Sequence, residues 1–409
     1  MLTRRQAFFA TTALAAFGAA GAAYAADKVI KIGVDLSLTG ADSQGANRVK
    51  NAIVMAFEAA NEGHAVPGHR FDLLVTDDGT ATAGQYDPAQ AATNARKMVA
   101  DREVMAAIGP QMSGAGKAMT PILSQGGLAT ITPSSTNPDI SSPKFAEQYR
   151  PAGKPIYFRT VTTDAYQGPN MANFFAEKLK VKSVYVLDDS GAFGVGVADS
   201  FQKQAEAKGM KVLGRDRLDP KAADYTAILT KIKSLNPDAI YYGGVTQAGV
   251  KLAKQAYDII PNAIKGGPDG MTSSDLLSGA GFPAVEGWYT SIAAPHLVED
   301  QKAAQFVAAF KGKFNESPDD YSITAYDASL VIIDAVKRVV ASGKPVTREA
   351  VREAIQTAKV PTIQGMVSFD ENGDLADRTV SVFQIKKDTS KPLTDISAQY
   401  KYIDVAPQS

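Results

Sequence analysis

Hydroxyl side chains gather after two predicted strands, where they could bind a carboxylate. Ser113 follows the strand that ends at Ile108, at a position where a helix should begin. Ser134, Ser135 and Thr136 follow the next short strand. A hydroxyl beside the free backbone N–H groups of a helix start is a suitable carboxylate site. The alternative is that these hydroxyls only cap helices, and spacing alone does not separate the two interpretations.

Asp269 is an acidic residue in a Gly-Pro-Asp-Gly loop of the second half of the chain. Aspartate is common in turns because its side chain bonds the nearby backbone. Residue type alone therefore favours a turn aspartate over a ligand-binding one.

Catalytic motifs are imperfect throughout the chain. No serine lies in a G-x-S-x-G nucleophile elbow, and there is no cysteine. The adjacent carboxylates Asp77–Asp78 and Asp188–Asp189 point apart, so they are interpreted as caps or solvated loop acids. Gly109–Lys117 ends like a P-loop, but Ala118 replaces the Ser or Thr that would hold magnesium. Three histidines cannot supply a zinc cluster, so we expect no cofactor and no metal.

Two further glycine-containing segments match ligand-binding loops only in part. Gly191–Gly196 is the reverse of the dinucleotide fingerprint, and Asp370–Asp374 has its glycine two positions early for a calcium loop. We interpret the second segment as a tight hairpin turn.

Alternating strands and helices must position these residues in the first half of the chain. The predicted elements are strands at Val29–Leu36, Phe71–Val75, Val104–Ile108 and Ala129–Ile131, with helices at Arg48–Asn61 and Pro88–Ala100. Asp87 before Pro88 is typical of a helix start. This alternation favours βαβ units and a parallel sheet, which binds ligands beyond the carboxyl ends of its strands.

The alternation resumes after a surface loop predicted at 141–155, where proline and glycine are frequent. The later predicted elements are β-rich runs at Val184–Leu187, Ala239–Tyr242, Met366–Phe369 and Val380–Ile385, and helices at Val197–Lys208, Tyr225–Ser234, Gly249–Tyr257, Ala303–Lys313, Tyr326–Ala341 and Thr347–Thr357. The length suits two α/β lobes.

Charge and the first residues limit the function. The chain has 409 residues, with 43 Lys and Arg against 43 Asp and Glu. Nucleic-acid binding needs a basic excess, so we expect no nucleic-acid partner. Residues 1–25 combine Arg4 and Arg5, an alanine-rich apolar run and an Ala-Tyr-Ala end. This pattern is typical of a secretory signal peptide.

A signal peptide predicts export to a bacterial periplasm. Ala7 stands where twin-arginine signals usually carry an aromatic residue, so the ordinary export route is favoured. Without cysteine, the chain can form neither a disulfide nor a lipid anchor on an N-terminal cysteine. We find no second apolar segment of membrane length, so the mature chain is expected to be soluble.

Eight segments, in this order, resemble the periplasmic branched-chain amino-acid-binding proteins of ABC transporters, the Leu/Ile/Val-binding type. The segments are Lys31–Val34, Thr76–Asp78, Ile131–Pro138, Phe158–Thr160 with Asp164 and Gln167–Pro169, Tyr241–Gly244, Gly267–Gly270, Glu286–Gly287 and Phe369–Asp374. The resemblance covers essentially all of the chain after the signal peptide.

The resemblance implies a type I periplasmic binding protein, an α/β fold of two Rossmann-like lobes joined by a three-strand hinge. Matching the pattern places lobe I at 26–163 with 292–378, and lobe II at 164–291 with 379–409. Members of this family bind a small molecule in the cleft and close around it. The implied partners are that ligand and an inner-membrane ABC permease, and the implied state is a monomer.

The resemblance also implies roles for individual residues. Ser113 and Thr136 would hold a ligand carboxylate, and the carbonyl of Ser134 would accept from an α-ammonium. Asp269 would pair with that ammonium. Phe193 and Tyr321 match aromatic positions that line the pocket.

Three departures bear on the ligand. Val245 replaces a cleft tyrosine, Phe193 lacks a hydroxyl often found there, and Met112 occupies the place of a cysteine. The ligand is expected to be a branched-chain or other neutral amino acid. An aromatic or other organic carboxylate, or an amide, is the alternative, because an ammonium with few partners is costly to bury. An exported α/β enzyme is the remaining alternative, and no residue set supports it.

Overall fold

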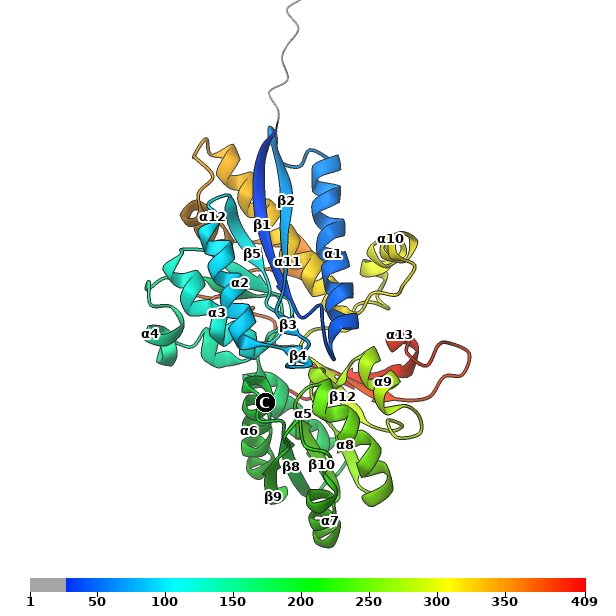
Figure 1. The fold of residues 1–409 in the computed structure, drawn as a ribbon. Coiled ribbons are helices and arrows are strands. Elements are labelled where there is room, and N and C mark those ends of the chain that lie inside the picture. Colours follow the sequence, from blue (N-terminus) through cyan, green and yellow to red (C-terminus); the bar gives the residue numbers. More distant parts are fainter. Residues whose placement is uncertain (1–26) are drawn as a thin grey trace, which may run out of the picture.

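The computed structural model describes residues 27–409, and the predicted signal peptide at 1–25 lies outside this range. Two lobes lie one above the other, each built on a sheet with helices on both faces (Figure 1). The predicted α/β class is therefore confirmed. Among residues 27–409, no helix is long and apolar enough to cross a membrane.

The first lobe contains a five-stranded sheet in the order β2-β1-β5-β6-β7, and all of its pairs are parallel as predicted. Its strands are β1 (Lys28–Leu36), β2 (His69–Asp77), β5 (Val104–Ile108), β6 (Thr130–Thr132) and β7 (Tyr157–Arg159). Two small hairpins accompany it: β3 (Gly79–Thr80) with β4 (Gln85–Tyr86), and β13 (Val360–Thr362) with β14 (Gly365–Val367).

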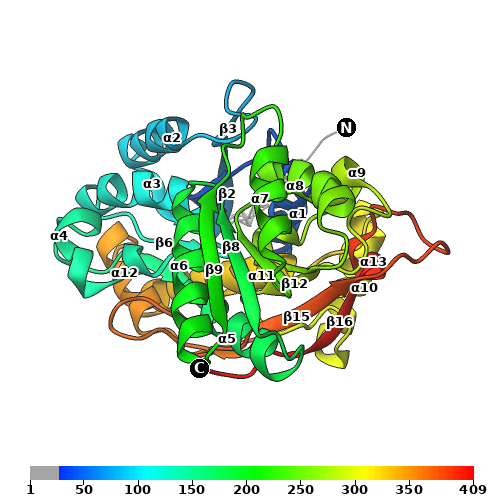
Figure 2. The same ribbon diagram turned by 90° about the horizontal axis from the view of Figure 1, so that it is seen from below.

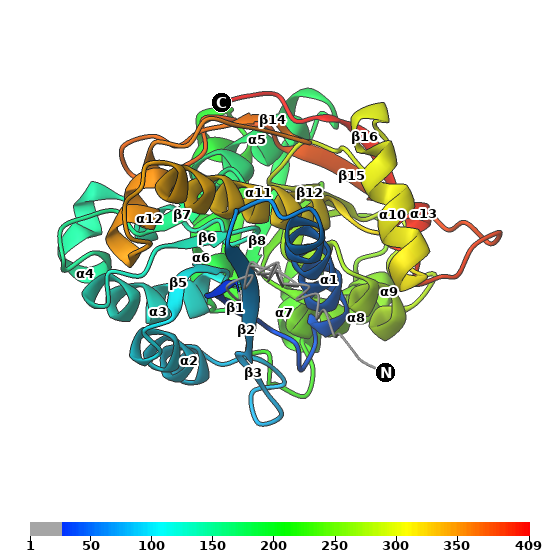
Figure 3. The same cartoon turned by 90° about the horizontal axis from the view of Figure 1, so that it is seen from above.

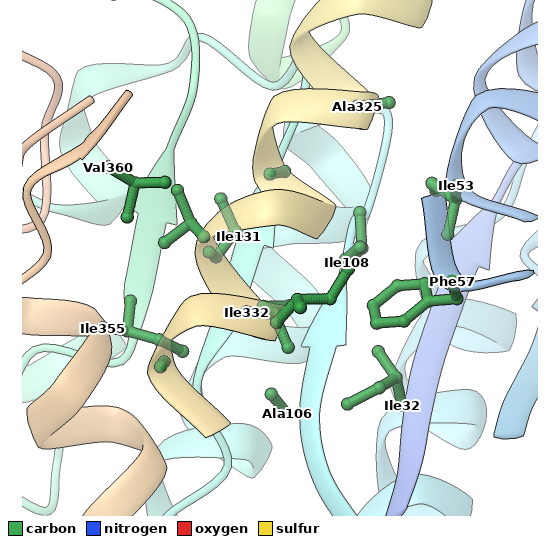
Figure 4. Packing of buried hydrophobic residues seen from close by; sticks show 14 of the residues in the cluster. Ile32, Ile53, Phe57, Ala106, Ile108, Ile131, Ala325, Ile332, Ile355 and Val360 are labelled. Atoms are coloured by element: carbon green, nitrogen blue, oxygen red, sulfur yellow. The ribbon is translucent and has the colours of Figure 1, made fainter. Parts of the chain in front are cut away.

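Helices cover both faces of this first sheet (Figure 3). They are α1 (Ser43–Glu62), α11 (Asp320–Ala341) and α12 (Arg348–Gln356) on one face, and α2 (Pro88–Ala100) and α3 (Ser113–Gln125) on the other. In Figure 4, Ile32 and Ile108 of the sheet face Phe57 of α1 and Ile332 of α11. Burial of these apolar side chains is the main force that holds the helices to the sheet.

The second lobe contains a seven-stranded sheet in the order β16-β15-β12-β11-β10-β8-β9. Its strands are β8 (Ser183–Asp188), β9 (Lys211–Arg217), β10 (Ala239–Gly243), β11 (Ile264–Gly266), β12 (Tyr289–Ile292), β15 (Ser381–Ile385) and β16 (Tyr400–Val405). The pairs β12–β15 and β15–β16 are antiparallel and the others are parallel.

Helices also cover both faces of the second sheet (Figure 2). They are α5 (Asp164–Glu177) and α6 (Ala192–Ala207) on one face, and α7 (Thr226–Leu235), α8 (Thr246–Ile259) and α9 (Ser274–Ala280) on the other. The remaining helices are α4 (Ala146–Tyr149), α10 (Ala304–Phe314) and α13 (Ile396–Gln399).

The chain passes between the lobes in three segments that bond to one another. The Thr162 N–H donates to the carbonyl of Ala293 at 2.9 Å, and the Ser381 hydroxyl donates to the carbonyl of Ala294 at 2.8 Å. These contacts support the predicted division near 164, 291 and 379, which stays a proposal.

Several elements differ from the sequence predictions. Helix α1 begins at Ser43, five residues before the predicted start. The prediction missed this first turn because it carries Ser and Gly and lacks the apolar stripe that marks the rest of the helix. The expected loop at 141–155 contains a short 3₁₀ turn and α4. The hairpin turn predicted at Asp370–Asp374 is confirmed, since the Asp370 N–H donates to the Asp374 carbonyl at 2.9 Å.

Candidate ligand-binding site

A cavity lies between the two lobes and is lined by residues that follow strand ends of both sheets. The lining residues are Asp42, Gly45, Val49, Gln111, Met112, Ser113, Ser134, Phe193, Val245, Asp269, Gly270, Thr272, Ser273, Asp319 and Tyr321. The cavity has a volume of about 70 Å³, which limits the occupant to a small molecule. The predicted residues Ser113, Ser134, Phe193, Asp269 and Tyr321 are therefore brought together.

Ser113 opens helix α3 toward the cavity. No side chain caps this helix, so the N–H groups of its first turn are free of a side-chain partner. The Ser113 hydroxyl oxygen accepts from the Asn137 N–H and from the Ser135 hydroxyl, both at 3.2 Å. Its own proton is left to donate, which is the chemistry that a carboxylate requires.

Ser135 and Thr136 lie behind the cavity wall rather than in it. Ser135 donates its hydroxyl to Ser113, and its own N–H is held by Thr132 Oγ1 at 2.9 Å. The Thr136 carbonyl accepts from the Asp164 N–H at 2.9 Å. The geometry thus assigns both residues a supporting position, and their predicted contact with a ligand carboxylate stays a prediction.

Asp269 and Tyr321 meet across the lobes in the same cavity as Ser113. The Tyr321 hydroxyl donates to Asp269 Oδ2, and the Gly270 N–H donates to Oδ1 at 2.9 Å. Gln167 Oε1 accepts from the Asp269 N–H at 3.1 Å and so fixes the loop. Burial raises the pKa of the Asp269 carboxyl to about 6, and the Tyr321 hydroxyl partly offsets this. Asp269 is thus both a turn residue and a cavity residue.

An apolar wall completes the cavity. Phe193 at the start of α6 and Val245 before α8 pack together, and Met112 contacts them. Val245 lines the cavity with an apolar side chain, so this position offers no hydroxyl. The wall suits the carbon chain of a small ligand.

Direct contacts hold the two lobes together around the cavity. Arg48 on α1 donates to Asp319 Oδ2 and to the Ser274 hydroxyl of the second lobe, each at 3.0 Å. Gln247 on α8 donates to the carbonyl of Ala83, in the β3–β4 hairpin, at 2.9 Å. The lobes are therefore closed on each other.

Several lining residues escaped the sequence analysis. Asp42 and Gln111 stand just before helices α1 and α3, and Asp319 caps α11. Asp319 could have been found from its capping pattern, because it accepts from the Ser322 N–H at 2.8 Å. Asp42 and Gln111 carry no such signal, since their position at the cavity depends on how α1 and α3 pack.

The carboxylate pairs considered for catalysis are structural. Asp77 Oδ1 accepts from the backbone of Leu38 and Gly79, and Asp189 accepts from Gly191 and Val245. Asp78 and Asp188 are both fully buried, so the interpretation as solvated acids is wrong for them. Asp78 accepts from the Ser37 hydroxyl at 2.7 Å, and Asp188 pairs with Arg215 at 2.7 Å.

Comparison with known proteins identifies the family. The family model of the periplasmic binding proteins matches residues 29–390. The chain therefore belongs to the periplasmic binding protein family, whose characterised members are substrate-binding receptors. The predicted resemblance and fold class are confirmed.

Three similar proteins illustrate the range of the family. The chain is 31% identical to the leucine-, isoleucine-, valine-, threonine- and alanine-binding protein of Pseudomonas aeruginosa, over 95% of this chain and 97% of the relative. The leucine-binding protein LivK of Thermotoga maritima is 26% identical, with a TM-score of 0.78 over 92% of this chain and 98% of that one. A solute-binding protein of R. palustris solved with benzoate has a TM-score of 0.75 at 19% identity, covering 93% of this chain and 97% of that chain, and shares the fold.

Proposed function

We propose that this chain is an amino-acid receptor of an ABC importer, and that its cavity holds both the α-carboxylate and the α-ammonium of the ligand, the carboxylate at Ser113 and the ammonium at Asp269. The observation that carries the proposal is the pairing of Asp269 with Tyr321 in the same cavity as Ser113. The carboxylate of Asp269 is suited to an ammonium, and the free proton of Ser113 and the start of α3 are suited to a carboxylate.

The charges around the cavity favour an amine-bearing ligand over a simple organic anion. Its lining includes three aspartates and no basic residue. Arg48 neutralises Asp319, but Asp269 makes no ion pair within residues 27–409. An amine-free carboxylate such as benzoate would add a negative charge beside an unpaired one, which is unfavourable in a buried site. The neutral amino acids named for the P. aeruginosa relative are the first ligands to test.

The cellular setting is part of the same proposal. The signal peptide at 1–25 would direct export to the periplasm, and the closed receptor would act as a monomer on an inner-membrane permease. The chain would act as a receptor and not as an enzyme, because the acid pairs that could do acid–base work bond to backbone groups and arginine instead.

Calorimetry on protein that has been unfolded and refolded, to remove carried ligand, tests this proposal. L-leucine, L-valine, L-threonine and L-alanine are compared with benzoate and with 4-methylpentanoate, which is leucine without its amine. We expect binding of amino acids, and a loss of about tenfold or more in Asp269→Asn. Asp258→Asn, an exposed aspartate on α8, serves as the matched control and should bind as the parent does. Tight binding of 4-methylpentanoate or benzoate, with no amino acid bound, would contradict the proposal.

A further inference from the structure

The start of helix α1 brings a second carboxylate, Asp42, to the same cavity. Asp42 is 6% exposed and lines the cavity, and its side chain does not cap the helix. Its Oδ2 atom is buried without a hydrogen-bond partner. A buried acceptor without a donor is unfavourable, so this oxygen is suited to accept a hydrogen bond from a ligand.

Gln111 presents a second unpartnered acceptor from the loop before α3. Its Oε1 atom is also buried without a partner, and Gln111 lines the same cavity. The amide nitrogen of Gln111 lies 3.9 Å from the position that a Cβ on Gly45 would occupy. Gly45 is three residues from Asp42, so the side chain of Gln111 extends toward the start of α1. Asp42 and Gln111, which precede different helices, thus each bring an unpartnered acceptor to the wall of the same cavity.

Val49 and Met112 supply apolar surface in the same cavity. Such a wall with oxygen acceptors at its end fits a ligand side chain that has methylene groups and a terminal donor. An aliphatic side chain would fill the wall and leave both oxygens without a partner.

The surroundings of Asp42 contain acids and no compensating base. Asp42 makes no ion pair within residues 27–409, and burial with the nearby charges of Asp275, Asp189 and Asp78 raises its pKa to about 7. The Thr246 hydroxyl favours the charged form, although it also bonds Ser273 Oγ at 2.9 Å. A hydrogen-bond donor on the ligand would stabilise the charged carboxylate of Asp42.

We propose that Asp42 and Gln111 form a side-chain subsite, and that the preferred ligand is an amino acid whose side chain ends in N–H donors, as an amide or an amine. This inference rests on the proposed amino-acid function and narrows it. An amide and an amine both donate N–H hydrogen bonds, and the binding experiment distinguishes between them.

Matched ligand pairs test the subsite by calorimetry on refolded protein. L-asparagine and L-leucine have nearly the same shape and differ in the amide, whereas L-ornithine and L-norvaline differ in the terminal ammonium. We expect the donor-bearing member of at least one pair to bind about tenfold or more tightly. Preference in the first pair indicates an amide, and preference in the second indicates a cation.

Variants then assign the preference to the two residues. Gln111→Leu and Asp42→Leu should each reduce the asparagine-to-leucine or ornithine-to-norvaline affinity ratio at least several-fold. Asp258→Asn and Gln301→Leu, both exposed, should leave the ratios unchanged. If Asp42→Leu fails to fold, the affinity ratios of Gln111→Leu and of the parent protein still test whether the subsite exists.

Two outcomes overturn the inference in distinguishable ways. Leucine and norvaline binding as tightly as asparagine and ornithine would overturn the subsite and leave the amino-acid function standing. Binding of amine-free acids alone would overturn the proposed function and the subsite together.

Discussion

Asp269 shows how a buried carboxyl links ligand affinity to pH. Its pKa in the empty site is raised to about 6 by burial, and an ammonium ligand needs the charged form. Protons therefore compete with the ligand as the pH falls through 6. Asp164, the nearest buried acid of α5, has its pKa raised to about 8, chiefly by burial and next by Asp269, so it stays largely neutral at pH 7.

We expect affinity for an amino acid to be greatest above pH 7 and to decline below pH 6, approaching tenfold per pH unit. Titration calorimetry at pH 7.5, 6.5, 5.5 and 4.5 measures this decline. Asp269→Asn should bind weakly and show a flatter profile, while Asp258→Asn should follow the parent. Affinity that is constant from pH 7.5 to 5 would rule out Asp269 as the ammonium partner.

At the residue scale, the sequence identified the cavity residues that follow strand ends. Ser113 and Ser134 could be predicted in this way because parallel strands bind ligands beyond their carboxyl ends, which lie at one edge of the sheet. Ser135 and Thr136 could not be sorted from them, since which hydroxyl faces the cavity depends on how Thr132 Oγ1 holds the loop. Asp42 was missed because its role depends on the packing of α1.

At the scale of elements, the β3–β4 hairpin and helix α8 form a direct contact between the two lobes. Gln247 donates to the Ala83 carbonyl across the cleft without lining the cavity. This bond stabilises the closed arrangement, and closure slows ligand release.

Gln247→Leu should weaken ligand binding about two- to tenfold through faster dissociation, because one net hydrogen bond contributes about 0.5–1.5 kcal/mol. Surface plasmon resonance or stopped-flow fluorescence would separate the two rates. Gln202→Leu is the matched control, since Gln202 bonds Glu206 on its own helix at 3.0 Å. Equal dissociation rates in the two variants would show that the cross-lobe bond does not stabilise the closed receptor.

Prediction of elements succeeded where the apolar pattern was regular. Helix α2 begins at Pro88 as expected, with Asp87 accepting from the Ala89 N–H at 2.8 Å. Strands β9 and β16 were not predicted, because β9 is nowhere fully buried and only the first residue of β16 is. Their position at the sheet edges explains the missing signal.

At the scale of the whole molecule, buried acids should make the empty receptor more stable in mildly acidic conditions. The pKa values are raised to about 8 for Asp164, to about 7 for Asp42, and to about 6 for Asp78, Asp189, Asp269 and Asp327. Burial is the first cause in each. The unfolded chain has lower values, so the folded state binds more protons between pH 4 and 8.

The free energy of unfolding should therefore rise as the pH falls from 8 toward 5, and the melting temperature of ligand-free protein should rise with it. Differential scanning calorimetry at pH 8, 7, 6 and 5 checks the direction. Surface acids with lowered pKa values, such as Asp101 and Asp404, stabilise the folded state, and this contribution to the free energy of unfolding is lost only near pH 4 and below. A melting temperature that falls steadily from pH 8 to 5 would contradict the prediction.

The α/β class followed from the alternation of strands and helices, but the assembly of each lobe from separate stretches did not. Periodicity describes neighbours along the chain, whereas α11 returns to the first sheet after β12 has joined the second. Only the resemblance to a known family suggested that arrangement.

This return of the chain has a consequence for folding during synthesis. The first sheet lacks the helix that buries Ile32 and Ile108 until Asp320–Ala341 has been made, and the second sheet lacks its last two strands until residues 381–405 follow. A chain that emerges from its N-terminus can therefore complete neither lobe early, and both finish almost together at the end of translation. Neither sheet therefore reaches its full set of packed elements until translation is nearly finished.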